Sequence, residues 1–179
     1  RSKLPPVGTI GNLDFPDVEH ATLSNGIKVN FARRAAVPVV LVSAQFDAGY
    51  AADQRGKLGL QSLMASLLDE GTTSLNSREI AEAKERLGAN IDTGSSLDRS
   101  TVSLSALSAY LGPSLELLGD IVKNPAFDPA ELERVRTQRL TAIKQLQKDP
   151  NGIAQRVLPP LLFGDAHPYA TLAGGHPPP

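Results

Sequence analysis

The sequence predicts an α+β domain, in which an antiparallel sheet carries helices packed on one face. Strand patterns occur in groups joined by short turns, and helical patterns come in consecutive pairs between and after those groups. No Gly-rich phosphate loop accompanies them, since Gly56 and Gly59 form neither a G-x-G-x-x-G motif nor a P-loop. The patterns therefore favour an antiparallel α+β fold over a doubly wound nucleotide-binding fold.

Composition excludes several classes of function. The chain has 179 residues, 41% of them hydrophobic, which is enough for one domain with a proper core. Its 18 Lys and Arg residues balance 19 Asp and Glu residues, so no basic excess exists to bind a nucleic acid. The absence of Cys excludes disulfides and thiolate metal sites. No run of about 18 apolar residues occurs, so we expect no transmembrane segment.

The two ends of the chain suggest a piece of a longer protein. The chain begins Arg1-Ser2 and its single methionine is Met64. Residues 1–18 are rich in Pro and Gly and lack periodicity, which predicts a linker or lead-in. Residues 19–179 are expected to form a single α+β domain. We expect it to be truncated at its C-terminal end, because residues 174–179 cap no recognisable element.

The first strands surround an Asn-Gly pair. Residues 21–24 and 27–31 alternate in polarity on either side of Asn25-Gly26, which predicts a hairpin with a type I′ turn. A longer strand is expected over 37–48, where Val, Leu and Phe are abundant. Its apolar composition favours a place in the core of the sheet over an edge to which a peptide could add.

The middle of the chain predicts two helices and then two strands. Leucines at three- and four-residue spacing indicate a helix over 57–69, and a second helix is expected from an N-cap at Ser77 to Gly88. Strands are expected over 89–93 and 100–107. In the second strand apolar and Ser residues alternate, which is typical of a half-buried strand with a polar outer face.

Three further helices are expected over 108–124, 128–148 and 153–163. Asp128 is a good N-cap for the long middle helix, and Pro129 suits its first position. The sequence Asp-Pro-Asn-Gly at 149–152 is expected to break the chain between the last two helices.

Seven segments fall in an order that is typical of one known family. They lie at residues 23–29, 38–40, 46–50, 59–72, 87–91, 148–150 and 163–169. In this order the chain resembles a domain of the insulinase/pitrilysin family of zinc metallopeptidases, to which mitochondrial processing peptidase belongs. The resemblance covers most of the chain and implies a metallopeptidase (LuxS/processing-peptidase-like) domain.

The resemblance also identifies where the family's chemistry should lie. Active members carry an inverted H-x-x-E-H motif on the helix that ends in Glu-Gly-Thr. Its two His bind zinc, its Glu activates water, and an acidic ligand comes from the later long helix. Here Ser62 and Ser66 stand at the His positions, Ala65 at the Glu position, and Thr141-Ala142 near the acidic position. Neutral hydroxyls and methyl groups cannot replace those ligands or that base.

The resemblance therefore implies the non-catalytic, zinc-less half of a peptidase. Such a half completes the peptide-binding chamber with a separate zinc-bearing half, which is either another subunit or another part of the same chain. This reading implies no catalytic residue, metal ligand or cofactor in this chain, zinc in the other half, and a peptide substrate. The parent protein would be a zinc-dependent metalloendopeptidase.

Two other functions stay open. One is a structural assembly domain of the same fold, like the core subunits of respiratory complexes. The other is an active hydrolase whose site is unrecognised, which the residues favour least. The Ala- and Leu-rich composition points weakly to a bacterium. In a bacterium the resemblance implies a periplasmic or membrane-associated location.

The histidines and serines also have simpler interpretations. His167 and His176 could suggest a metal site, but His167 precedes a Pro, and His20 lies far away in the sequence. A surface or turn role is the more economical interpretation. Ser62 and Ser66 could form a nucleophile pair, but in mid-helix they more simply make a packing face of small residues.

The charged residues suggest no site of their own. Asp47, Asp53 and Asp69-Glu70 fall at the ends of expected elements, where solvated carboxylates are common. A basic series follows the long helix. It either faces solvent or grips the partner half, and the sequence leaves both open. The series comprises Arg134, Arg136, Arg139 and Lys144.

Overall fold

The computed structural model describes residues 8, 11, 15–172 and 174–175, so most of the expected lead-in over 1–18 lies outside the described residues. The chain divides into two compact units, residues 1–38 and 39–179. Each unit is described by itself, and the single domain expected over 19–179 stays a prediction. Within the described residues, no helix combines the length and the apolar character needed to cross a bilayer.

The first unit contains the expected hairpin, formed by β1 (Val18–Thr22) and β2 (Lys28–Ala32). The prediction of a type I′ turn is wrong. That turn needs a positive φ at both central residues, but here Gly26 has a positive φ (86°) and Asn25 does not. The Asn25 side chain instead accepts a hydrogen bond from the Ile27 amide (3.2 Å), and the Gly26 amide donates to the Leu23 carbonyl (2.9 Å). A five-residue loop therefore connects the strands.

The second unit is built on a three-stranded antiparallel sheet. Its strands β3 (Val39–Phe46), β4 (Asn90–Ser95) and β5 (Ser100–Leu107) lie in the order β3-β5-β4. The predicted alternation of β5 is confirmed, because its even-numbered residues from Ser100 to Ala106 are buried and those between them are half-buried. The antiparallel α+β architecture predicted from the sequence is also confirmed.

The expected position of the apolar strand is wrong in this sheet. Strand β3 pairs with β5 alone among the described strands of residues 39–179, so it lies at an edge and β5 lies in the centre. Leu41 of β3 is 78% exposed, whereas Leu104 of β5 is 1% exposed. An apolar composition predicts burial of a strand but does not fix its order in the sheet, which depends on pairing between distant segments.

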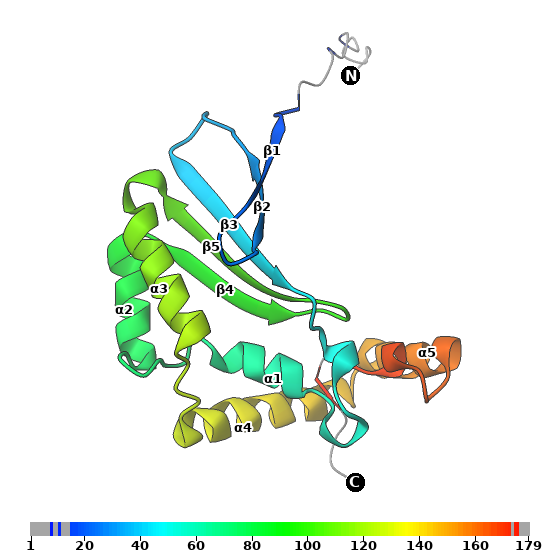
Figure 1. The fold of residues 1–179 in the computed structure, drawn as a ribbon. Coiled ribbons are helices and arrows are strands. Elements are labelled where there is room, and N and C mark those ends of the chain that lie inside the picture. The colour runs from blue at the N-terminus through cyan, green and yellow to red at the C-terminus, as the bar shows by residue number, and fades with distance from the viewer. Residues whose placement is uncertain (1–7, 9–10, 12–14, 173, 176–179) are drawn as a thin grey trace, which may run out of the picture. The chain divides into compact units, whose positions relative to one another are not determined.

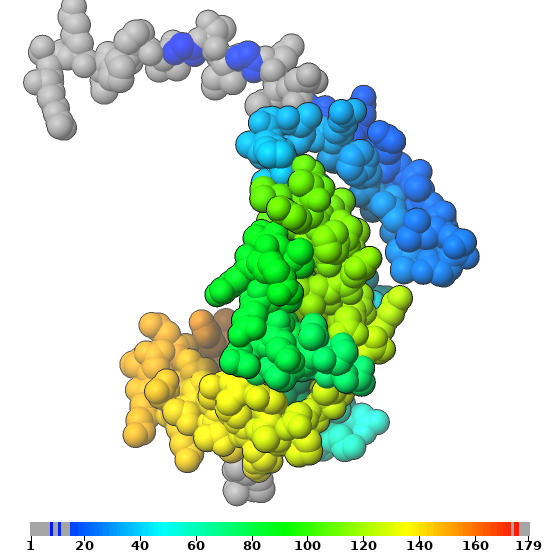
Figure 2. Space-filling model, turned by 90° about the vertical axis from the view of Figure 1, so that its left-hand side faces the viewer, coloured from blue at the N-terminus to red at the C-terminus, as the bar shows by residue number. Residues whose placement is uncertain are grey.

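Helices cover one face of this sheet. Helices α2 (Ser77–Leu87) and α3 (Leu111–Lys123) lie side by side, and α3 packs on β5 (Figure 1). Helix α1 (Leu60–Leu67) packs against β4, and α4 (Pro129–Leu146) runs along α1. Figure 2 shows α2 and α3 in green above the yellow α4.

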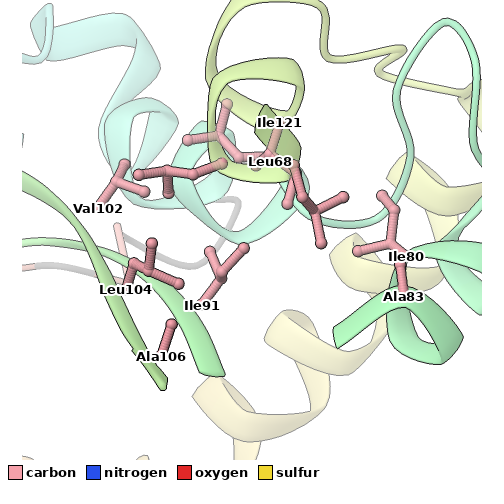
Figure 3. Close-up of a cluster of buried hydrophobic side chains, with 10 residues drawn as sticks. Leu68, Ile80, Ala83, Ile91, Val102, Leu104, Ala106 and Ile121 are labelled. Carbon is pink, nitrogen blue, oxygen red and sulfur yellow. The ribbon is translucent and has the colours of Figure 1, made fainter. Parts of the chain in front are cut away.

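The core lies between the sheet and these helices (Figure 3). The strand side chains Ile91, Val102 and Leu104 point toward Ile121 of α3, which has no exposed surface. Close packing of these side chains supplies most of the stability of such a domain. On α3 the small residue Ser114 is fully buried, whereas Leu115 is 40% exposed.

The start of α2 differs from the sequence prediction, and the start of α4 agrees with it. Asn76, and not Ser77, caps α2. Its side chain accepts from the Glu79 amide (3.0 Å), and the Glu79 carboxylate accepts from the Asn76 amide (2.8 Å), which completes a capping box. Asp128 caps α4 as predicted, with its carboxylate accepting from the Ala130 amide (2.7 Å).

The expected break at 149–152 instead starts α5 (Pro150–Phe163). The Asp149 carboxylate accepts from the Gly152 amide (2.7 Å), and Pro150 occupies the first helical position, where it loses no intrahelical bond. A Cβ at Gly152 would lie 2.5 Å from the Leu146 carbonyl oxygen. Glycine at this position therefore lets α5 turn directly off the end of α4.

Candidate functional site

Helix α1, on which the resemblance places the family's motif, is fixed at both ends. The two carboxylate oxygens of Asp53 accept from the amides of Gly59 (2.8 Å) and Gln61 (3.0 Å) at its start. Near its end, the Thr93 hydroxyl of β4 donates to the Ala65 carbonyl (2.6 Å). Asp53 is thus a structural cap, because its carboxylate satisfies amides that have no partner inside the helix.

The motif positions lie on the inner side of α1. Ala65 is 2% exposed and Ser62 is 8% exposed, and the Ser62 hydroxyl has no hydrogen-bond partner. The Ser66 hydroxyl donates to the Ser62 carbonyl (2.9 Å) one turn earlier. A hydroxyl turned back on its own helix is not an activated nucleophile. The assignment of these residues to the family's motif rests on the resemblance and stays a prediction.

Arg139 of α4 reaches across to this face of α1. Its guanidinium donates to the Ser66 hydroxyl (3.1 Å), the Ser62 carbonyl (3.2 Å) and, more weakly, the Gly59 carbonyl (3.4 Å). These contacts connect α4 to the two serines at the expected zinc-ligand positions. Neither interpretation of the basic series, solvated face or partner contact, describes this side chain.

Arg139 was missed because charge alone places arginine on a helix surface. It lies four residues after the buried Val135 and four residues before the buried Ile143, and so belongs to the inward stripe of α4. This spacing was the available signal. Arg134 remains exposed, as the solvated-face interpretation expects, although it pairs with Glu70 just beyond α1.

The electrostatics of this face oppose a bound cation. Burial lowers the pKa of the Arg139 guanidinium, but the ordinary value is so high that the group remains charged. A positive charge beside two neutral hydroxyls repels Zn²⁺ and offers it no thiolate, imidazole or carboxylate. Within the described residues, no group of three or more His, Asp or Glu side chains is placed to hold a metal ion.

The expected acidic-ligand position also lacks a ligand. The Thr141 hydroxyl donates to the Thr137 carbonyl (2.9 Å) of its own helix. Ala142 lies beside a cavity but offers only a methyl group.

This cavity, of about 690 Å³, opens beside the motif face. Helices α1, α4 and α5 and the end of β4 form its walls, so it is called the α1–α4–α5 cavity below. Its charged lining residues are Glu70, Arg139 and Arg156. The neutral polar side chains that line it are Ser62, Ser66, Ser95, Gln138 and Gln155. The other lining side chains are apolar and include Val135, Ile143 and Leu146, so the motif face is one wall of a largely apolar cavity that carries two arginines.

The other candidate residues serve structural roles. His167 caps a short 3-10 helix (Pro168–Ala170) by accepting from the Tyr169 amide (3.1 Å), and its ring stacks on Phe163. His20 bonds to Asn30 across the hairpin (2.7 Å), and His176 lies outside the described residues. The prediction that His167 is a turn residue is thus confirmed.

Three of the four acidic candidates are engaged in the fold. Asp69 pairs with Lys84 (2.8 Å) and Glu70 pairs with Arg134, while Asp53 caps α1 as described above. Asp47 is exposed just after β3, as predicted for a solvated carboxylate. The four carboxylates do not converge on one site.

Comparison with known proteins agrees with this geometry. The family described as Insulinase (Peptidase family M16) matches residues 28–173. This chain belongs to that family. A protein of Helicobacter pylori named "Non-peptidase homolog YmxG" is 28% identical over 170 residues, which cover 94% of this chain and 39% of that protein. The alpha subunit of the mitochondrial processing peptidase of Solanum tuberosum is 27% identical over 133 residues, 74% of this chain and 26% of its own length.

A solved structure is similar over almost the whole chain. It is the peptidase M16 inactive domain from Pseudomonas fluorescens, with a TM-score of 0.84 and 30% identity over 89% of this chain and 39% of that one. The chain thus spans about two-fifths of the length of these bacterial relatives. Their names and the fold identify this chain as a non-catalytic M16 domain.

Proposed function

We propose that this M16 domain forms one wall of a peptide chamber whose other wall is a homologous zinc-bearing half. In this arrangement the domain holds an extended peptide, and the other half supplies the zinc and the base. The observation that carries the proposal is the edge of β4 beside the α1–α4–α5 cavity. Among the described strands of residues 39–179, β4 pairs with β5 alone, so no such strand pairs with its other edge.

The position of this edge supports peptide binding. Gly94 and Ser95 at the end of β4 line the cavity together with Ser62 and Ser66. A peptide that adds to a sheet edge gains main-chain hydrogen bonds, and alternate side chains project into neighbouring pockets. Such binding tolerates many sequences, as a chamber for unfolded peptides requires.

The need for a zinc-bearing partner is tested by measuring activity with and without that partner. The protein is purified alone and together with a zinc-bearing M16 homologue from the same genome, and zinc content and cleavage of an unfolded peptide are measured. We expect no stoichiometric zinc and no cleavage from this chain alone, and cleavage by the pair beyond that of the homologue alone. Tight one-to-one zinc with cleavage by this chain alone would overturn the proposal. A pair no faster than the homologue alone would favour the assembly domain.

Edge addition is tested without changing the protein. A fluorescent extended peptide is compared with two versions that are N-methylated at alternate residues, in the two possible phases. Methylation keeps the side chains but removes N–H donors. We expect one phase to bind at least about tenfold more weakly in fluorescence anisotropy, since a strand turns one set of amides toward its partner. Equal binding of all three peptides would exclude addition to the edge of β4.

A further inference from the structure

The described lining of the α1–α4–α5 cavity contains two arginines and one acidic side chain. Arg139 and Arg156 line it, and Glu70 is the one acidic side chain among the described residues that do so. The Glu70 carboxylate is engaged by Arg134, which also pairs with Glu131 (2.6 Å). Glu70 is therefore poorly placed to balance Arg156, which stands on a different wall of the cavity.

Two polar groups of the cavity are buried without partners. The Arg156 Nε atom is inaccessible and has no hydrogen-bond partner, and the same is true of the Ser62 hydroxyl, whose residue is 92% buried. Buried donors without an acceptor are uncommon and costly, and the cost is greatest for a charged group. Both residues line the same space, but these two atoms are themselves inaccessible, so a ligand in the cavity would meet Arg156 through the rest of its half-buried side chain.

The donor set selects a carboxylate as the ligand. A guanidinium presents parallel N–H groups that match the two oxygens of a carboxylate, and hydroxyl and amide donors can complete the binding. A phosphate is less suitable, because the proposed occupant is a peptide, whose own anionic groups are carboxylates.

We infer that this cavity binds a carboxylate of an extended peptide, with Arg156 as the principal partner. This inference rests on the proposed function, since the end of β4 would deliver the peptide to the cavity. The carboxylate could belong to an Asp or Glu side chain or to the C-terminus of the peptide.

The first experiment separates these two sources. Four versions of one fluorescent peptide are used. Each has either Glu or Gln at a single test position, and either a free or an amidated C-terminus. They are titrated into the wild-type protein and the variants R156Q, R156K and K148Q. Lys148 is the matched control, because it is exposed, does not line the cavity and carries the same charge.

We expect the wild type to bind the matching carboxylate at least about tenfold more tightly than its amide, the ratio typical of a charge-assisted hydrogen bond. The ratio should fall to near one in R156Q, fall partly in R156K and persist in K148Q. Weaker binding after Glu→Gln replacement identifies a side-chain carboxylate as the source. Weaker binding after amidation identifies the C-terminal carboxylate. Equal binding of all four peptides by the wild type would overturn the carboxylate site and leave the peptide chamber standing.

A second experiment does not depend on peptide binding. The Arg Nε–H resonances of the ¹⁵N-labelled protein are followed while sodium acetate replaces sodium chloride at constant ionic strength, and the Arg156 signal is assigned by its loss in R156K. We expect a saturable shift of this signal. If no peptide binds while acetate shifts the signal, the site stands and the proposed chamber fails. If Arg156 does not respond to acetate, the site is refuted.

Discussion

Arg139 links α4 to α1 at the motif face. Its guanidinium donates to a hydroxyl and two carbonyls of α1. Because the side chain is half-buried, its hydrogen bonds are exchanged with water less easily than those of a surface ion pair. The resemblance places metal ligands of the active members on this face of α1, and here Arg139 contacts the residues at those positions.

We expect R139M to lower the free energy of unfolding by about 1–3 kcal/mol, because methionine retains the apolar stem but leaves buried acceptors without donors. Urea unfolding measures the change. The matched control is R136M on the same helix, where the arginine is 59% exposed and pairs with Glu133. That variant should stay within about 0.5 kcal/mol of the wild type. Equal losses in the two variants would show that Arg139 is no more than a surface cation.

Asp120 gives the domain a pH-dependent contact. Hydrogen bonds from Asn124 (2.8 Å), Thr72 and Ser74 (3.0 Å) hold the pKa of its carboxyl below the ordinary value. A depressed pKa in the folded state adds stability above the unfolded pKa, near 4, and this contribution is lost as the pH falls through the folded pKa.

We therefore expect the stability difference between the wild type and D120N to be largest near neutral pH and to shrink as the pH falls from about 5 to 3. Urea unfolding across this range measures it. D165N is the control, since Asp165 is exposed and forms no hydrogen bond or ion pair within the described residues. A difference that is constant with pH would rule out the carboxylate as the source.

Among the elements, α2 offers the sharpest test of a local rule. Asn76 and Ser77 are both good N-cap residues, and the sequence alone favoured Ser77. In the structure Asn76 forms the capping box with Glu79, and Ser77 is already the first helical residue. The choice depends on the direction in which the preceding chain enters, which residue type does not determine.

We expect N76A to cost about 1 kcal/mol, because it leaves the Glu79 amide without its acceptor. S77A should change the stability by less than about 0.5 kcal/mol, since its side chain forms no hydrogen bond within the described residues. Thermal and urea unfolding of the pair distinguish the two caps. A larger loss in S77A than in N76A would restore the sequence-based assignment.

Elements could be predicted where the local sequence pattern allows only one structure. The alternation of Val102, Leu104 and Ala106 with serines was sufficient to predict β5. In a half-buried strand, residues of the buried and the exposed face alternate along the sequence. The start of α5 was missed because Asp-Pro-Asn-Gly is a turn signal and equally a helix start, with Asp149 as cap and Pro150 as first residue. Local composition cannot separate those two uses.

At the scale of the molecule, the order of strands was the feature that the sequence could not supply. Consecutive strands neighbour one another in about two-thirds of cases, and β4 and β5 follow this tendency. Strand β3 instead pairs with β5 after two intervening helices, and this places it at an edge. The loss of ligands at Ser62, Ala65 and Ser66 is what the family resemblance predicts, and it stays a prediction. The arginine-lined cavity beside them could not be predicted, since it requires α1, α4 and α5 to meet.

The bridge from Arg139 to α1 has a consequence for how the protein matures. A metal ion must be acquired by a finished chain, whereas an arginine is synthesised with it, so this pair of helices can assemble without any supply of zinc. We expect the unfolding midpoint to be the same after dialysis against EDTA and after addition of zinc. A midpoint that falls with the chelator and recovers with zinc would contradict this. If the midpoint is unchanged, the domain folds equally well with and without a supply of zinc.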